Sequence, residues 1–176
     1  MSRVVALMLT GLLALMCSST TSSSIGQPVP QPVQKQIEAY AAAWASRNPD
    51  AIAALHTQDT LFRLQVQGEA DVRGRDAVRQ RFADLLRDNP LYSSTAQRVT
   101  VGGNGLVVIE YTFVMGPASD FTLGRWIYTP TGRSYAVNAV DVIRFAEDGV
   151  AEKVTWLDVD AIRSNSMAAV RLEAQP

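Results

Sequence analysis

The chain has 176 residues and carries 16 Lys and Arg against 17 Asp and Glu, a formal net charge of −1 at pH 7. This near balance, with arginines that are scattered rather than clustered, predicts that nucleic acid is not a partner. Cys17 is the only cysteine, which excludes an intrachain disulfide, a thiolate metal cluster and a catalytic thiol inside the domain. His56 is the only histidine, so a zinc site of several histidines is excluded, and a Ser-His-Asp triad would depend on that one residue. We therefore expect neither a metal nor a cofactor.

Residues 1–19 are predicted to be an export signal. Arg3 gives a short positive region, and the apolar run from Val4 to Met16 is shorter than the roughly 20 residues that span a bilayer. Cys17, directly after this run, resembles the lipidated cysteine of a bacterial lipoprotein signal, although a larger residue precedes it than that motif has. Ordinary cleavage nearby and a buried N-terminal helix are the alternatives. Residues 20–32, rich in Ser, Thr and Pro, predict a linker. We expect an extracytoplasmic domain that meets the membrane only through such an anchor.

Helices are predicted next along the chain. The first carries an apolar stripe at helical spacing, formed by Val33, Ile37, Tyr40 and Trp44. Asn48 and Pro49 are typical of a helix start, so a short second helix is expected from Pro49 to about His56, with His56 at its surface or boundary. A third is expected from Arg75 to Asp88, and its stripe is Val78, Phe82 and Leu85.

The remainder is predicted to form strands. Apolar runs bounded by Gly and Pro turns indicate strands at residues 60–66, 96–101, 106–115 and 121–129. A hairpin follows, with strands at 136–145 and 150–158 joined by a turn that ends at Gly149. The tail after residue 160 is left open between a short helix and a frayed end. Helices first and antiparallel strands afterwards predict an α+β fold, in which a curved antiparallel sheet wraps around the N-terminal helices.

The hairpin supplies the first candidate site residue. Alternation places Asp141 on the same face as apolar neighbours, namely Val137, Ala139, Ile143 and Phe145. An ionised carboxylate is costly there unless it is paired or hydrogen-bonded. On the second strand of the hairpin, the residues expected to share one face are Val150, Glu152, Val154 and Trp156.

Three stretches carry a family resemblance. They are IEAYAAAWASRNPDAIAALHTQDTLF from residue 37, VRGRDAVRQRF from residue 72 and TPTGRSYAVNAVDVIRFAEDGVAEKVTWLDVD from residue 129. They resemble the nuclear transport factor 2-like superfamily, and within it the SnoaL-like, polyketide cyclase-like proteins. The resemblance implies a cone with a deep pocket over residues 33–162, a tail at 163–176, and a homodimer formed through the outer sheet face. It does not specify the chemistry, because the superfamily includes enzymes and binding domains.

The resemblance also implies site residues. Asp141 and Tyr40 stand where ketosteroid isomerases carry a protonated aspartic acid and a tyrosine that donate to an oxyanion. Leu64 stands at the position of their general base, so double-bond isomerisation of a steroid is not expected. Asp160 follows Trp156 at the spacing of a catalytic aspartate in SnoaL-like cyclases, but the histidines that those enzymes often carry are absent.

Two functional hypotheses fit these patterns. The first is a pocket for a small apolar ligand, with a lyase, isomerase or cyclase step on a carbonyl-containing substrate. Its catalytic residues would be Asp141, Asp160 and Tyr40, and its substrate-binding residues Trp44, Trp156 and Asn138. The alternative is a non-catalytic extracytoplasmic binding or dimerisation domain of the cell envelope, in which the same side chains are structural. An open pocket favours the first hypothesis, and a pocket filled by aromatic rings of the protein favours the second.

Overall fold

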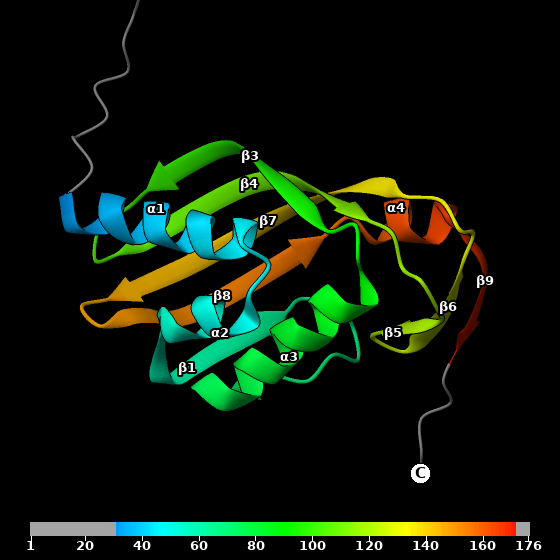
Figure 1. Ribbon diagram of the computed structural model, residues 1–176, viewed down its shortest axis with the longest axis horizontal. Helices are drawn as coiled ribbons and strands as arrows, with labels where there is room; N and C mark the ends of the chain where they lie inside the picture. The colour runs from blue at the N-terminus through cyan, green and yellow to red at the C-terminus, as the bar shows by residue number, and fades with distance from the viewer. Residues whose placement is uncertain (1–30, 172–176) are drawn as a thin grey trace, which may run out of the picture.

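The computed structural model describes residues 31–171, whose arrangement is shown in Figure 1. The predicted export signal, Cys17 and the linker as far as residue 30 lie outside the described residues. The elements are α1 (Gln31–Ala45), α2 (Pro49–Ala54), β1 (His56–Leu64), β2 (Val72–Arg73), α3 (Arg75–Asp88), β3 (Ser93–Val101), β4 (Leu106–Met115), β5 (Phe121–Leu123), β6 (Trp126–Pro130), β7 (Tyr135–Ala146), β8 (Gly149–Leu157), α4 (Val159–Ser164) and β9 (Ser166–Arg171). Within 31–171, no helix combines the length and the apolar character needed to cross a bilayer.

The strands form two sheets. The larger has six strands in the order β2-β1-β8-β7-β4-β3, and the smaller has the order β5-β6-β9. Strand β1 runs parallel to β8, and the other neighbouring strands are antiparallel. Figure 1 shows α1, α2 and α3 on one side of the larger sheet, with the smaller sheet and α4 at one end. The predicted α+β class, a curved sheet with helices on one face, is confirmed.

The core lies between the N-terminal helices and the sheet face that they cover. Strand β7 alternates as predicted, and its buried residues are Val137, Ala139, Asp141, Ile143 and Phe145. On the helices, Val78 and Phe82 of α3 and Tyr40 of α1 are almost fully buried. Burial of each large apolar side chain contributes about 1.5–3 kcal/mol, so this layer supplies much of the driving force for folding.

The second helix starts as predicted, but its end differs. The side chain of Asn48 accepts hydrogen bonds from the N–H groups of Asp50 (2.9 Å) and Ala51 (3.3 Å), which is the expected cap. The helix ends at Ala54, and His56 is the first residue of β1. The prediction that His56 lies at the surface or boundary of a helix was therefore wrong: its side chain is fully buried. The cause is sheet pairing, because His56 lies beside Val150 of β8.

A bulge changes which residues of β8 face inward. The register of β8 against β7 shifts beside Arg144 and Phe145. Val150 is buried, whereas Trp156 faces outward and is 45% exposed. The prediction that these two residues share a face was wrong, because one extra residue in a strand reverses the alternation. The same shift turns Lys153 and Thr155 toward the interior, where both are buried.

The segments near the C-terminus are more divided than expected. The predicted strand at 121–129 is a hairpin of β5 and β6 that turns at Gly124, where φ is +61° and a Cβ would collide with the carbonyl oxygen of Gln67. After residue 158 the chain forms α4 and then β9, which pairs with β6. The fold therefore continues past residue 162 into the segment predicted as a tail.

Candidate functional site

A cavity of about 450 Å³ lies between α1 and the covered face of the larger sheet. Helix α3 and strands β1, β3, β4, β7 and β8 complete its wall. Most of the lining is apolar or aromatic, and examples are Ile37, Trp44, Leu64, Leu85, Ile109 and Phe113. The volume is within the range of about 300–1,000 Å³ that is usual for small-molecule sites. Several polar side chains of this lining gather around Asp141.

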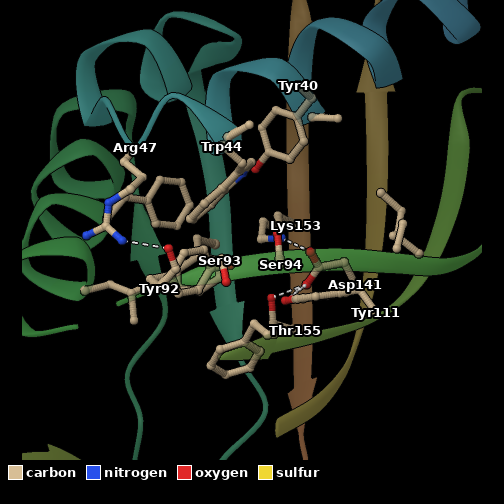
Figure 2. A pocket seen from close by; sticks show the side chains of 18 of the residues that line it. Tyr40, Trp44, Arg47, Tyr92, Ser93, Ser94, Tyr111, Asp141, Lys153 and Thr155 are labelled. Atoms are coloured by element: carbon tan, nitrogen blue, oxygen red, sulfur yellow. Dashed lines mark hydrogen bonds and ion pairs between the residues drawn. The ribbon is translucent and has the colours of Figure 1, made fainter. Parts of the chain in front are cut away.

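Asp141 is held by three donors on two neighbouring strands, β4 and β8. The Thr155 hydroxyl donates to Oδ1 at 2.6 Å, and the Tyr111 hydroxyl donates to the same oxygen at 3.3 Å. The Lys153 ammonium donates to Oδ2 and forms an ion pair with it. Figure 2 shows these side chains converging below Tyr40. The buried carboxylate is thus paired and hydrogen-bonded, which offsets the cost of removing it from water.

Lys153 is the main functional candidate that the sequence reasoning missed. Its side chain is only 5% exposed, and the residue lies in register with Ile143 on β7. The bulge hid it, because without that extra residue Lys153 would face solvent. One signal could have found it. Lys153 and Thr155 alternate with Trp156 along the strand, so they lie on the face opposite to it. A lysine between apolar strand residues needs an anionic partner if it is buried, which marks Lys153 as a candidate.

Tyr40 belongs to a second buried polar chain. Its hydroxyl lies 3.1 Å from Nε2 of His56, and Nδ1 of His56 lies 3.0 Å from the hydroxyl of Thr60. Burial, together with the positive charges of Lys153 and Arg75, lowers the pKa of His56 to about 3, so the ring is neutral at neutral pH. Burial also raises the pKa of Tyr40 well above its ordinary value, although the Trp44 side chain beside its hydroxyl opposes this rise. The side chains of Tyr40, His56 and Thr60 therefore form a hydrogen-bonded network that is uncharged at neutral pH.

Trp44 forms an aromatic wall of the cavity beside the polar groups around Asp141. Its ring centroid lies 4.9 Å from that of Phe82 and 5.7 Å from that of Tyr92. The ammonium nitrogen of Lys153 lies 5.6 Å from the Trp44 ring centroid and 5.8 Å from that of Tyr40. Nε1 of Trp44 is buried and has no hydrogen-bond partner among residues 31–171. A buried indole N–H usually finds an acceptor, so this donor is suited to a ligand oxygen.

Three predicted site residues lie elsewhere. Trp156 and Asn138 border a shallow hollow of about 280 Å³ on the outer face of the sheet, away from the cavity. Asp160 lies in the first turn of α4, where its side chain is 90% exposed and 3.7 Å from Arg163. The structure thus brings together Asp141, Tyr40 and Trp44, and it separates from them the three residues that were expected to share their pocket. No group of His, Cys, Asp and Glu within the described range is arranged to hold a metal.

A family model for SnoaL-like domains matches residues 37–154. The chain belongs to the SnoaL-like domain family. No curated protein matches it. The SnoaL-like domain is similar in fold to a putative SnoaL-like polyketide cyclase from Jannaschia sp. CCS1 (19% identity, 81% of this chain and 99% of that chain, TM-score 0.66). It is also similar to a protein with a ketosteroid isomerase-like fold from Catenulispora acidiphila, solved with trimethylamine (18%, 85% and 100%, 0.61). A third is a nuclear transport factor 2-like protein of unknown function from Burkholderia pseudomallei (13%, 79% and 100%, 0.64).

In this SnoaL-like domain Asp141 has different surroundings from those that the ketosteroid isomerase resemblance implies. A protonated aspartic acid would donate a hydrogen bond into the pocket. Here Lys153, Thr155 and Tyr111 all donate to Asp141, so its oxygens act as acceptors. The ammonium of Lys153 and the indole N–H of Trp44 are two donors near Asp141 that a ligand oxygen can meet.

Proposed function

We propose that this SnoaL-like domain binds a small, largely apolar molecule with a polar handle in the cavity below α1. The observation that carries the proposal is the open space itself. About 450 Å³ is left beside Tyr40, Trp44 and Phe82, although their rings pack against one another. An apolar wall with a few convergent polar groups is typical of ligand sites. A pocket filled by the protein's own aromatic rings has less support, because this space is unfilled by protein atoms.

The polar floor supports carbonyl chemistry as the finer part of this proposal. An ammonium group has three N–H donors, and Asp141 is the hydrogen-bond partner of Lys153 among residues 31–171. The other donors, with the hydroxyl of Tyr40, would hold the oxygen of a carbonyl-containing substrate. Asp141 would take or return a proton through Lys153. A lyase, isomerase or cyclase step would then depend on Asp141, Lys153 and Tyr40, with no part for the exposed Asp160.

The outer face of the sheet supports a second candidate function. Trp156 is 45% exposed there, beside Asn138 and Val140 in the shallow hollow. Large exposed aromatic side chains are enriched at protein interfaces. In this alternative the chain is a homodimeric binding domain of the cell envelope, exported through its N-terminal signal and held by a lipid on Cys17.

The ligand proposal is tested by a thermal-shift screen of the purified protein against polycyclic ketones, aromatic acids and lipid-like molecules. A ligand at 100 times its Kd stabilises the folded state by about 2.7 kcal/mol, which raises the melting temperature measurably. Two exposed alanines of α1 provide matched variants, because Ala41 lines the cavity and Ala42 does not. We expect Ala41→Trp to remove the shift by filling the cavity and Ala42→Trp to keep it.

Equal shifts in both variants would place the ligand outside the cavity. No shift for any compound in the panel would favour the alternative, a homodimeric binding domain. The pairing of Asp141 with Lys153 makes these alanines better tools than Asp141→Asn, since that change leaves a buried ammonium without its carboxylate.

A further inference from the structure

We propose that Lys153 forms a covalent imine with an aldehyde or ketone that occupies the cavity. This inference rests on the proposed function, because the carbonyl compound must first enter the cavity, and it adds a bond-forming step. It is carried by the identity of the buried cation, by the group that can take its proton, and by the free space beside both.

The identity of the cation is unusual for this chain. Lys35 and Lys153 are the only lysines among 16 basic residues. Every other ion pair within residues 31–171 uses an arginine, and each of those pairs has a partner that is at least 31% exposed. The pair of Lys153 and Asp141 is the buried one, with side-chain exposures of 5% and 8%. A guanidinium cannot lose its proton in a protein, whereas an amine can, and only the amine is a nucleophile.

A proton acceptor is in place for that amine. Oδ2 of Asp141 contacts the Lys153 nitrogen, while Thr155 and Tyr111 hold Oδ1 and so fix the orientation of the carboxylate. Transfer of a proton from the nitrogen to Oδ2 converts two buried charges into two neutral groups. Surroundings of low polarity favour the neutral forms of both an amine and a carboxylic acid. The cavity therefore supplies what an attacking lysine needs, a local base beside a mostly apolar wall.

The step balances within these groups. Asp141 takes one proton from the Lys153 ammonium, and the amine nitrogen attacks the carbonyl carbon to form a carbon–nitrogen bond. The nitrogen loses a proton to the former carbonyl oxygen, which becomes a hydroxyl. Protonated Asp141 then gives its proton to this hydroxyl, the carbon–oxygen bond breaks, and water leaves. The products are a protonated imine on Lys153, an Asp141 carboxylate beside it, and one water. The ion pair is present before and after the step.

The space around the nitrogen defines the class of carbonyl compound. The rings of Trp44 and Tyr40 have centroids 5.6 and 5.8 Å from the Lys153 nitrogen, and the rest of the wall is mostly apolar. The indole N–H of Trp44 makes no hydrogen bond within residues 31–171 and is suited to hold the carbonyl oxygen before attack. The site therefore fits an aromatic or other apolar aldehyde or ketone.

Reductive trapping tests the inference. The purified full-length chain is incubated with 2-naphthaldehyde and sodium cyanoborohydride, which reduces an imine to a stable secondary amine. Peptide mass spectrometry then compares the two lysines. Lys35 is exposed on α1 and provides an internal control. We expect Lys153 to be modified in preference to Lys35 despite its burial. We also expect 2-naphthalenemethanol, which cannot condense, to suppress labelling of Lys153 alone.

Two variants test the role of Asp141 and keep the experiment decisive. We expect Asp141→Asn to lower labelling of Lys153 by about tenfold or more through loss of the proton acceptor, with Lys35 unchanged. If this variant does not fold, Thr155→Val replaces it. This change removes one of the two hydroxyl donors that orient Oδ1 of Asp141, and it is expected to give a smaller loss. Labelling of Lys35 without Lys153, or labelling of Lys153 that the alcohol does not suppress, overturns the inference. If 2-naphthalenemethanol raises the melting temperature but Lys153 is never trapped, ligand binding stands and the imine fails. If neither occurs, both proposals fail.

Discussion

Acid should destabilise this protein through His56. The side chain is fully buried and neutral, and its pKa is lowered from 6.5 to about 3. In the unfolded chain the ring regains an ordinary pKa and binds a proton as the pH falls below 6.5. The unfolded state then binds more protons than the folded state, so stability is complete above about pH 6.5 and declines toward pH 3. Between pH 7 and pH 5 the expected loss in the free energy of unfolding is about 2 kcal/mol, from 1.36 kcal/mol per pKa unit.

The measurement is urea denaturation at a series of pH values between 7 and 5. His56 is the only histidine, and Asp and Glu side chains in model peptides titrate near pH 4, below this window. The matched variant is His56→Gln, whose amide can still meet the Tyr40 hydroxyl. It should be less stable at pH 7 but lose almost nothing further at pH 5. A wild-type protein as stable at pH 5 as at pH 7, or a variant with the same slope, would refute the reasoning.

Three other predictions concern the ion pair, a tight turn and the outer face. Lys153→Met should lower the free energy of unfolding by about 3–5 kcal/mol in urea denaturation, because Asp141 remains as an unpaired buried charge, and adding Asp141→Leu should restore most of it. A double variant as unstable as the sum of the single variants would contradict this. Gly105→Ala should cost about 2 kcal/mol or more, since φ is +71° and a Cβ would meet a neighbouring carbonyl oxygen. The control Gly103→Ala has open space and should be near neutral by the same assay. Trp156→Ser should lower the dimer fraction in light scattering without changing the ligand-induced thermal shift, and a monomeric wild-type protein would exclude that dimer.

Local signals were enough for much of the fold. The bounds of α3 and β4 agree with the residues predicted from the apolar periods and from the Gly and Asn-Pro boundaries. The alternation along β7, with Asp141 on the buried face, also holds. The pairing partners could not be read in the same way. Leu61 of β1 lies beside Glu152 of β8, and no local pattern specifies a contact between such distant parts of a sequence.

The candidate site was predictable only in part, for similar reasons. Tyr40 and Trp44 reach the cavity because the helical period of α1 places them on its buried stripe. The opposite wall of the cavity depends on the bulge in β8 and on the residue at which that strand ends. The bulge beside Phe145 turned Lys153 inward and Trp156 outward. The end of the strand mattered as well, because β8 stops at Leu157 and α4 then carries Asp160 into solvent. The roles of the residues that do line the cavity stay predictions.

The parallel pairing of β1 with β8 has a consequence for the time course of folding. Strand β1 follows the first two helices, but it pairs with β8, which comes much later in the sequence. Much of the native structure therefore depends on contacts of large sequence separation. Chains with such contacts fold slowly, because a long loop must close before any pairing stabilises it. On the ribosome, α1, α2 and β1 emerge well before β8 exists. The apolar stripe of α1 and the inner face of β1 therefore stay exposed to solvent during synthesis. The cavity forms only after the hairpin of β7 and β8, with Asp141 and Lys153, has been made.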